Sequence, residues 1–577
     1  MGFNAQSFGI RIPQFHLKYS KSGSRSKHVE TSCPVNLTMR IKKKAIVGYA
    51  VLSAYFLAIF FYISSKDIYH DYLDFISVFA LVGVLMLAAR TKWLYLGITA
   101  IFSVGIGLEV AFAYTYGSRL EMGVLYSVLD TNMHESTQML GTVSLLTLLM
   151  ALATAGLLLA LYRGGGLRLK GAWPALLLIL LGFSKLGYLT YKVDTHRAGW
   201  GYDLKASPFR SLADLTYDKM PVFWGDALFL YEAYLENAEN KHRLPHQRSP
   251  DGVTLDAASD RPRQIVIVIG EASFAGHYSS YGYARNTTPG MQRIFSGPNA
   301  CMVKGVHSPA PMTRDALLQS LTFSTPHDQT PYRNEKNIVE MAKEAGYKTY
   351  WLSSFHESGF YFSNIGLIAH YSDFYSEPSS HHSYKSESDD LALLKTFKKV
   401  FDPNEKQVII LHLNGSHAPY RARYDAQDAQ ALQGQPGMVL DYDRSIHHTD
   451  RLVSALDDLL SANSKDYLLF YAPDHGEVID PKSVAAAGSN GHGIEYGGVD
   501  QYEIPMMIKY SHGDYCGEVE RYRGPDGYIN AFAEHDLYSQ FMGYSIGLAA
   551  WRSYDAERPY VLHSDEHVYR YPDLPHR

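Results

Sequence analysis

Cysteine is scarce in this sequence, with three among 577 residues. Cys33, Cys301 and Cys516 are too few for a disulfide-dense scaffold or a cysteine-based zinc finger. The pair Cys301 and Cys516 could form one bridge, and the sequence leaves that open. Excess positive charge is also missing, because the formal net charge is −5. This balance gives no case for a nucleic-acid partner.

A secretory leader is not evident at the N-terminus. In residues 1–38 no apolar core precedes a small-residue cleavage site. From Met39 onward, a short basic stretch runs directly into an apolar one. We therefore expect residues 1–38 to be a disordered or mis-annotated extension.

Long apolar runs dominate the next part of the chain, residues 39–192. Each run approaches the about 20 residues that a membrane-spanning helix needs, and the five runs together contain almost no charged residues. The pattern predicts a transmembrane domain with five helices, at about 45–64, 71–89, 93–114, 142–162 and 172–191.

Basic residues set the orientation of these spans, since cytoplasmic loops are rich in Lys and Arg. Three basic clusters lie on one side: Arg40 with Lys42, Lys43 and Lys44; Arg90 with Lys92; and Arg163 with Arg168 and Lys170. An odd number of spans places the rest of the chain on the other side. We expect a multi-pass protein of a bacterial inner membrane with its C-terminal domain in the periplasm.

Residues 193–263 connect the two parts. An aromatic-rich amphipathic stretch at 220–234 predicts a helix lying on the outer leaflet. The next stretch, 237–263, is polar and predicts a linker.

The remaining domain, 264–577, contains four apolar runs that predict buried strands. They lie at about 264–270, 347–352, 407–413 and 466–472. Continuous β-branched or aromatic runs are typical of strands buried on both faces. Alternation of strand and helix patterns predicts an α/β fold with a mainly parallel sheet covered by helices.

Carboxylate or imidazole side chains follow three of these runs within a few residues. They are Glu271, His417 and the pair Asp474 and His475. Ligands of open α/β sheets bind outside the carboxyl ends of the strands. Carboxylates and imidazoles are metal ligands, so this edge is the predicted active site.

Each candidate has an ordinary alternative. Glu271 could cap a helix, and Asp474 could form a turn beside an incidental histidine. Thr313 follows a proline-rich stretch and precedes an apolar-periodic run, which places it at a helix N-terminus. There it is either a plain N-cap or a nucleophile whose anionic oxygen the helix dipole favours.

Histidines outside the strand ends are harder to assign, because the chain has 25 of them. His492 gains interest from its glycine-containing loop just after the Asp474–His475 pair. The pair His447 and His448 is interpreted as surface or helix residues. In the outer loop before the fourth span, Ser127, Thr131 and Glu135 share one helical face, for which a solvated face is the simpler interpretation.

Several motifs together resemble the phosphoethanolamine transferases. They are Gly-Glu-Ala-Ser at 270–273, Tyr-Gly-Tyr-Ala-Arg-Asn-Thr-Thr-Pro at 281–289, Tyr-Trp-Leu-Ser-Ser at 350–354, His-Leu-Asn-Gly-Ser-His at 412–417, Tyr-Asp-Arg-Ser-Ile at 442–446 with Thr449 and Asp450, and Ala-Pro-Asp-His-Gly-Glu at 472–477. The resemblance covers about 40–577. It implies a membrane enzyme with an alkaline-phosphatase/sulfatase-like periplasmic domain. The Thr313 segment is most similar to members that modify the core heptose of lipopolysaccharide.

The resemblance also implies residue roles. Zinc ligands would be Glu271, Thr313, Asp474 and His475, with Thr313 also the nucleophile. His417 and His492 would bind phosphate or transfer protons. Thr131 and Glu135 would contact the ethanolamine of the donor. The chain departs from the family pattern at Ala272, where Ser or Thr is usual, at Ser127, which is Asn in some members, and in lacking the cysteine bridges of many lipid A-modifying members.

The implied function is transfer of phosphoethanolamine from phosphatidylethanolamine, a membrane lipid, to lipopolysaccharide, at a core sugar or at lipid A, through a covalent threonine intermediate. Zinc suits the ligand set, and manganese remains an alternative for an oxygen-rich site. Other interpretations are a phosphoglycerol transferase, a phosphodiesterase or sulfatase-like hydrolase, and a non-catalytic membrane-anchored sensor. The Thr313 segment has no cysteine, which disfavours a sulfatase.

The predicted topology has a direct test. A reporter that is active only in the periplasm should work when fused after residue 200 and fail when fused at Gly165, because the basic flanks retain that loop in the cytoplasm. The reverse pattern of reporter activity would contradict the orientation.

Overall fold

The computed structural model describes residues 43–65, 72–116, 120, 133–164, 171–188, 231, 235, 244–256, 261–354, 363–376, 389–479, 491–494, 498–564 and 567–574. Residues 1–38 and most of 193–263 lie outside these ranges, so the predictions for them stay predictions.

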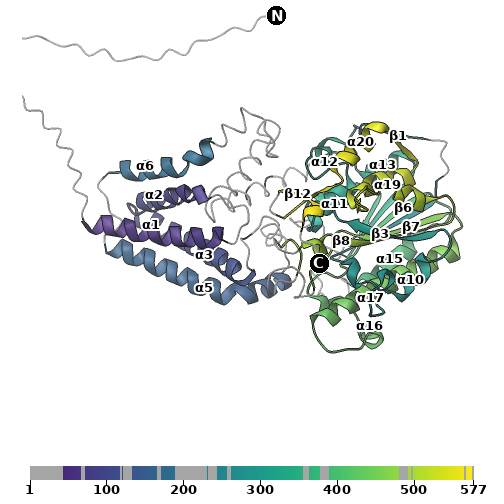
Figure 1. The fold of residues 1–577 in the computed structure, drawn as a ribbon, viewed down its shortest axis with the longest axis horizontal. Coiled ribbons are helices and arrows are strands. Elements are labelled where there is room, and N and C mark those ends of the chain that lie inside the picture. Colours follow the sequence, from purple (N-terminus) through teal and green to yellow (C-terminus); the bar gives the residue numbers. More distant parts are fainter. Residues whose placement is uncertain are drawn as a thin grey trace, which may run out of the picture. The chain divides into compact units, whose positions relative to one another are not determined.

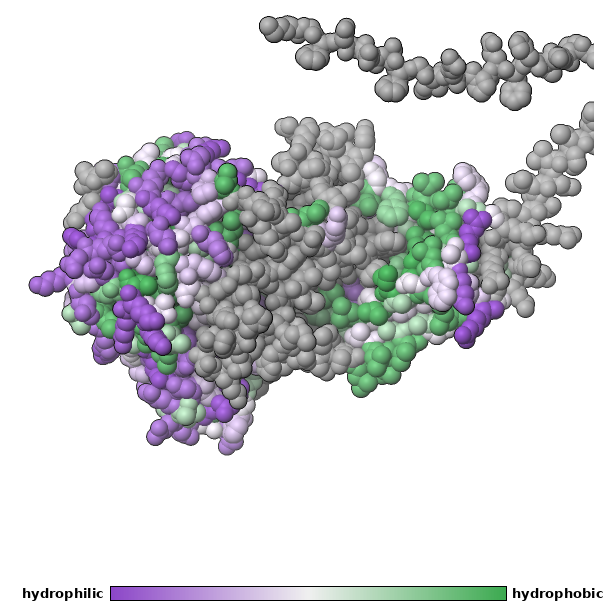
Figure 2. All heavy atoms as spheres, turned by 180° about the vertical axis from the view of Figure 1, so that it is seen from behind, coloured by the Kyte–Doolittle hydropathy of each residue, from purple (hydrophilic) through white to green (hydrophobic). Residues whose placement is uncertain are grey.

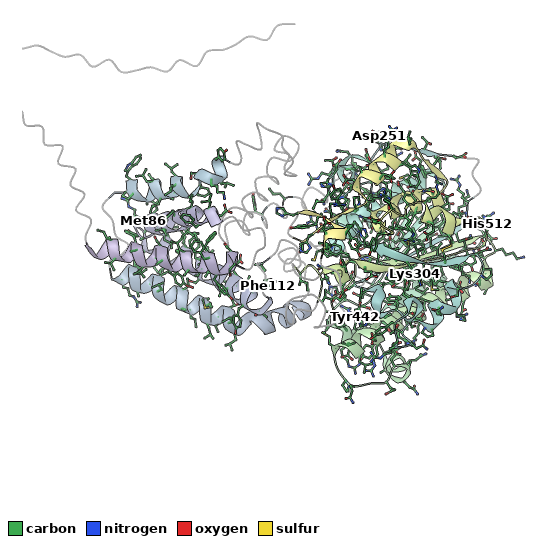
Figure 3. All side chains as sticks on the ribbon, in the orientation of Figure 1. Met86, Phe112, Asp251, Lys304, Tyr442 and His512 are labelled. Carbon is green, nitrogen blue, oxygen red and sulfur yellow. A yellow bond between two sulfur atoms is a disulfide. The ribbon has the colours of Figure 1, made fainter. Side chains whose placement is uncertain are left out.

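Three N-terminal helices are long and apolar enough to cross a membrane. They are α1 (Lys43–Ser64), α3 (Lys92–Tyr116) and α5 (Met133–Arg163) (Figure 1). Apolar side chains gather on the outer surface of this helical segment, whereas the surface of the C-terminal domain is largely hydrophilic (Figure 2). Met86 and Phe112 in Figure 3 both belong to the N-terminal helices.

The other two predicted spans are shorter than expected. Residues Tyr72–Ser77 form a 3₁₀ helix before α2 (Val78–Ala88), and α6 covers only Trp173–Gly182. Residues 184–188 beyond α6 are again helical, and Lys185 among them pairs with Asp74 of the 3₁₀ helix at 2.5 Å. The prediction of five full-length spans is therefore corrected: among the described residues three helices meet the length, and two apolar helices are shorter.

The C-terminal domain is built on an eight-stranded mixed sheet in the order β5-β4-β6-β2-β7-β8-β3-β9. Its strands are β2 (Gln264–Gly270), β3 (Ala300–His307), β4 (Lys348–Ser353), β5 (Phe374–Ser376), β6 (Gln407–His412), β7 (Tyr467–Pro473), β8 (Glu503–Tyr510) and β9 (Ile529–Asn530). β8 pairs antiparallel with both of its neighbours, and the other pairs are parallel. The sheet is mainly parallel, as expected, but β8 makes it mixed.

Helices cover both faces of this sheet, and each face has its own apolar core. One core takes side chains from α11 (Thr313–Leu321), α13 (Ile338–Glu344), α14 (Ser363–His370), α18 (Tyr515–Glu520) and α19 (Glu534–Phe541). The other takes side chains from α10 (Pro289–Phe295), α15 (Leu393–Val400) and α17 (Met438–Asn463). β2, β6 and β7 are fully buried, as continuous apolar strands between two helix layers must be.

Shorter elements complete the domain. They are α12 (Pro331–Asn334), α16 (Ala426–Ala431), α20 (Leu548–Glu557), and two small antiparallel sheets, β1 (Val253–Leu255) with β10 (Tyr544–Ile546) and β11 (Tyr560–Leu562) with β12 (Val568–Arg570).

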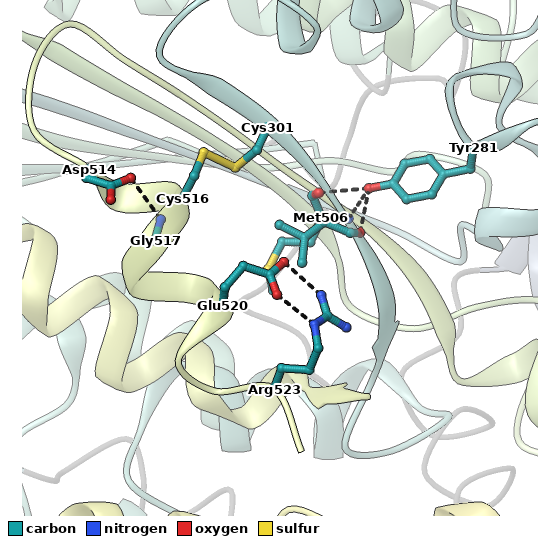
Figure 4. The surroundings of a disulfide bond; sticks show 9 residues. Tyr281, Cys301, Met506, Asp514, Cys516, Gly517, Glu520 and Arg523 are labelled. Atoms are coloured by element: carbon teal, nitrogen blue, oxygen red, sulfur yellow. Dashed lines mark hydrogen bonds and ion pairs between the residues drawn. A yellow bond between two sulfur atoms is a disulfide. The ribbon is translucent and has the colours of Figure 1, made fainter. Parts of the chain in front are cut away.

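A disulfide joins Cys301 of β3 to Cys516 of α18, the pairing that the sequence left open (Figure 4). Asp514 caps this helix by accepting a hydrogen bond from the Gly517 amide. The disulfide joins two cysteines that are 215 residues apart in the sequence, and so closes a long loop. Stable disulfides form in oxidising compartments such as the periplasm.

This bridge should stabilise the domain. Cys301→Ser is expected to lower its free energy of unfolding by about 2–4 kcal/mol, because the long loop becomes unconstrained in the unfolded chain. Urea unfolding of the purified protein measures the change, with Cys33→Ser as the control. Equal stability of the two variants would contradict the bridge.

The turn after β6 lies directly against the backbone just beyond β2. Gly415 adopts φ +46°, in the left-handed region. A Cβ on it would lie 2.7 Å from Glu271 N and 2.8 Å from Glu271 O. Ser416 N donates to Glu271 O at 3.0 Å. Glycine at 415 therefore allows the two strand ends to meet.

Gly415→Ala should destabilise the domain by about 1–3 kcal/mol more than Gly346→Ala, because both glycines have positive φ but only Gly415 is crowded. An added Cβ at Gly346 meets nothing within 4 Å. Urea unfolding of both variants isolates the steric cost, and equal losses would show that the contact with Glu271 is unimportant.

Candidate active site

Neighbouring strands place three of the predicted site residues side by side. β2 and β7 pair in parallel register, with Gly270 opposite Pro473. The next residues, Glu271 and Asp474 with His475, therefore emerge together at the carboxyl edge. All three side chains are buried, and one ligand atom from each lies within 4.8 Å of the others.

Helix α11 brings Thr313 to the same point. Its Oγ1 lies 3.2 Å from His475 Nε2, and 3.2 and 3.3 Å from the two carboxylate oxygens of Glu271. Thr313 is the first residue of the helix, while the N-cap position is taken by Met312, whose side chain makes no capping hydrogen bond. The hydroxyl thus faces the acidic cluster, which disfavours the simple N-cap interpretation.

Asp474 uses its two oxygens differently. Oδ1 accepts hydrogen bonds from the amides of Ala272 at 3.1 Å and His475 at 2.8 Å. Ala272 has φ +49°, in the left-handed region that disfavours a side chain. Oδ2 is buried and accepts no hydrogen bond from any described residue, although His475 Nε2 lies 3.3 Å away.

The pKa values of the two carboxyl groups, Glu271 and Asp474, shift in opposite directions. Burial, followed by the negative charge of Asp474, raises the pKa of Glu271 well above its usual value. Burial also opposes ionisation of Asp474, but His475 and hydrogen bonds from its neighbours outweigh it and lower the pKa of Asp474. Such a pair favours a positive charge between the two groups.

The residues present fit a divalent metal ion. His475 Nδ1 lies 2.8 Å from the carbonyl oxygen of Gly476, which can only accept, so Nδ1 carries the proton and Nε2 is free to ligate. Two carboxylates, this nitrogen and a hydroxyl form a ligand set that zinc accepts. The unpaired Asp474 Oδ2 is the buried polar atom that a cation would satisfy.

A second group of polar residues adjoins this cluster. Glu477 is buried and accepts from His492 Nδ1 at 2.7 Å and from the Tyr420 hydroxyl at 2.5 Å. The His492 ring lies 4.2 Å from the His475 ring, centroid to centroid. Since Glu477 holds Nδ1, the Nε2 atom of His492 is the one available for a substrate.

His417 completes the predicted set. Its ring lies 5.9 Å from that of His492, so the turn after β6 and the loop after β7 meet on one side of the cluster. Six predicted residues thus converge: Glu271, Thr313, His417, Asp474, His475 and His492. Thr131 and Ser127 lie outside the described residues, and the side chain of Glu135 in α5 is not described.

Sequence patterns missed several supporting residues. Glu477 stands in the Asp-His-Gly-Glu motif, which was the available sign of its role. Tyr442 of α17, labelled in Figure 3, donates to Ala272 O at 2.9 Å and accepts from Phe274 N at 2.8 Å. It thereby holds the strained residue after Glu271.

The pair His447 and His448 lies in a helix, as one interpretation had it, but not on the surface. Both residues are buried in α17. Their Nδ1 atoms each lie 2.7 Å from an oxygen of Asp428 in α16. The surface interpretation is therefore wrong, because this carboxylate draws both rings inward.

Comparison with known proteins finds similar sequences over most of the chain. The Sulfatase family model matches residues 263–542. Phosphoethanolamine transferase EptC of Escherichia coli strain K12 is 26% identical over 419 residues, 69% of this chain and 71% of that protein. The Kdo(2)-lipid A phosphoethanolamine 7''-transferase of the same strain is 24% identical over 456 residues, 74% of this chain and 77% of that protein.

A solved structure shares the fold over most of the chain. The integral membrane protein lipooligosaccharide phosphoethanolamine transferase A (EptA) from Neisseria meningitidis aligns with a TM-score of 0.60 and 19% identity, covering 89% of this chain and 98% of that one. The resemblance inferred from the motifs is thereby confirmed. Residues 263–542 thus match the Sulfatase family, and most of the chain is similar to phosphoethanolamine transferases.

Proposed function

We propose that this protein is a multi-pass inner-membrane enzyme that transfers phosphoethanolamine from phosphatidylethanolamine to lipopolysaccharide, with Thr313 as nucleophile. One observation carries the proposal: Thr313 Oγ1 lies 3.2 to 3.3 Å from Glu271 and His475, beside the unpaired Asp474 oxygen. The relatives named above are phosphoethanolamine transferases, which favours the same substrate class.

Glu271, Thr313, Asp474 and His475 would hold zinc. When bound, a zinc ion lowers the proton affinity of a nearby hydroxyl and offsets negative charge at phosphorus. The remaining chemistry belongs to the residues of the chain. The basic flanks favour a periplasmic position for the domain, and the disulfide fits that compartment.

In the first step, Thr313 Oγ1 gives its proton to a carboxylate oxygen of Glu271, to which it already donates at 3.2 to 3.3 Å, and attacks the phosphorus of the donor lipid. The bond from phosphorus to the diacylglycerol oxygen breaks, and that oxygen leaves with a proton. His492 is placed to give the proton from Nε2, since its Nδ1 is held by Glu477. The product is a phosphoethanolamine–threonine ester and free diacylglycerol.

In the second step, a hydroxyl or phosphate oxygen of the acceptor attacks the same phosphorus. His492 takes the proton from an attacking hydroxyl, and Thr313 Oγ1 leaves and takes its proton back from Glu271. His417 lies where it can contact the phosphoryl oxygens on the same side. Thr131, and Glu135 near the start of α5, are proposed to hold the donor's ethanolamine ammonium.

The experiment is intact-protein mass spectrometry after incubation with phosphatidylethanolamine and no acceptor. Wild type should gain one phosphoethanolamine unit on the peptide that contains Thr313. Thr313→Ala should gain none, because no oxygen remains to form the ester, and its transfer rate should fall by at least about 1,000-fold. Thr313→Ser should keep partial activity.

Thr322→Ala is the matched control, since Thr322 is also buried and comes immediately after α11. It should acquire the adduct as wild type does. An adduct on another residue, or normal transfer by Thr313→Ala, would refute the mechanism. Release of phosphoethanolamine to water at the full rate would identify a hydrolase instead.

A further inference from the structure

Asp390, at the start of a 3₁₀ helix (Asp390–Ala392), has no part in the mechanism above, yet it is buried beside the active site. Its Oδ1 accepts the Asn414 amide and its Oδ2 accepts the Gly415 amide, both at 2.9 Å. Two backbone donors on one carboxylate fix the turn after β6 in place.

The turn after β6 supports Glu271. Gly415 lies so close to Glu271 that there is no room for a Cβ, and Ser416 N donates to Glu271 O at 3.0 Å. His417 N donates to Asn414 O at 3.1 Å. Asp390 therefore contacts Glu271, a proposed metal ligand, only indirectly, through the backbone of the turn after β6. The same turn leads directly into His417.

The preceding residue anchors Asp390 to α17. Asp389 Oδ1 lies 2.9 Å from His448 Nε2, while His448 Nδ1 lies 2.7 Å from Asp428 Oδ2. Both ring nitrogens thus face carboxylates and must both donate, so His448 is an imidazolium. Burial alone would lower the pKa of His448, but Asp389 and Asp428 outweigh it and raise the pKa to about 10.

This cluster could itself be mistaken for a metal site, because Asp425, Asp428 and His448 offer three ligand atoms close together. Arg451 already fills the position: its Nη1 lies 2.9 Å from both Asp425 Oδ1 and Asp428 Oδ2. The cluster is therefore an ion-pair anchor with its positive charges supplied by the chain.

We propose that Asp390 is a positioning residue for Glu271, acting through the Asn414 and Gly415 amides, and that the His448 imidazolium fixes Asp390 by holding Asp389. The inference rests on the proposed function, in which Glu271 is a metal ligand. Outer groups that orient metal ligands typically contribute about 10- to 100-fold in metal affinity.

The test is zinc affinity of the full-length protein in detergent, measured by competition with a chromophoric chelator. Asp390→Asn should weaken zinc binding by about 10- to 100-fold, because an amide nitrogen would face one of the two N–H donors. Asp402→Asn is the control: Asp402 also accepts a backbone amide, Asn404 N at 2.8 Å, but at the other end of β6. It should bind zinc as wild type does.

A second pair of variants keeps the test decisive if Asp390→Asn does not fold. His448→Gln should weaken zinc binding and His447→Gln should not, because both rings contact Asp428 but only His448 also contacts Asp389. Hydrogen exchange of the metal-free protein gives an independent readout. Exchange in the peptide 413–417 should rise in Asp390→Asn and His448→Gln alone.

Glu271→Gln separates this inference from the proposed function. If Glu271→Gln loses zinc while Asp390→Asn and His448→Gln bind it normally, the positioning role is overturned and the metal site stands. If Glu271→Gln itself binds zinc as wild type does, both the metal site and the inference are overturned. Parallel losses in Glu271→Gln, Asp390→Asn and His448→Gln, with intact controls, support the proposal.

Discussion

Two buried carboxyl groups beside one imidazole make the strongest physical demand in this structure. Glu271 and Asp474 lie where water cannot solvate their charges, and one Asp474 oxygen has no hydrogen-bond donor among the described residues. Buried carboxylates are costly unless they are paired or ligate a metal. The arrangement is therefore costly on its own and suited to a cation, which links the fold to the proposed transfer chemistry.

The surrounding fold meets this demand through backbone contacts at the strand ends. Register between β2 and β7 sets Glu271 beside Asp474, and Gly415 lets the turn after β6 reach the same point. Helix α17 lies behind them: Tyr442 holds the backbone at Ala272 and Phe274, and His448 holds the Asp389–Asp390 turn. A helix that contributes no proposed ligand thus contributes much of the site's rigidity.

Much of this site was predictable from local sequence. Continuous apolar runs predict buried strands, and parallel strands bring the residues at their carboxyl ends to one edge, so Glu271, Asp474 and His475 were found together. Thr313 was found because prolines and apolar periodicity predict a helix start. Glu477 and Asp390 were missed because their roles depend on contacts with Tyr420, His492 and the 414–415 turn, which no local pattern encodes.

The errors have similar causes. His447 and His448 were interpreted as surface or helix residues, and they do lie in a helix, but their burial depends on Asp428, about 20 residues upstream in another helix. Hydropathy found the apolar segments at 71–89 and 172–191 but not the 3₁₀ turn around Asp74 or its pairing with Lys185. The sequence could not decide whether Cys301 and Cys516 pair, because they are 215 residues apart and only the tertiary fold brings β3 and α18 together.

The central claim is that Glu271, Thr313, Asp474 and His475 form one metal site around the nucleophile. Anomalous X-ray scattering from crystals of the zinc-loaded protein, recorded on both sides of the zinc absorption edge, tests it directly. The account predicts a strong peak within bonding distance of His475 Nε2, Thr313 Oγ1 and a carboxylate oxygen of both Glu271 and Asp474. An empty position there, with zinc bound elsewhere or not at all, would contradict it.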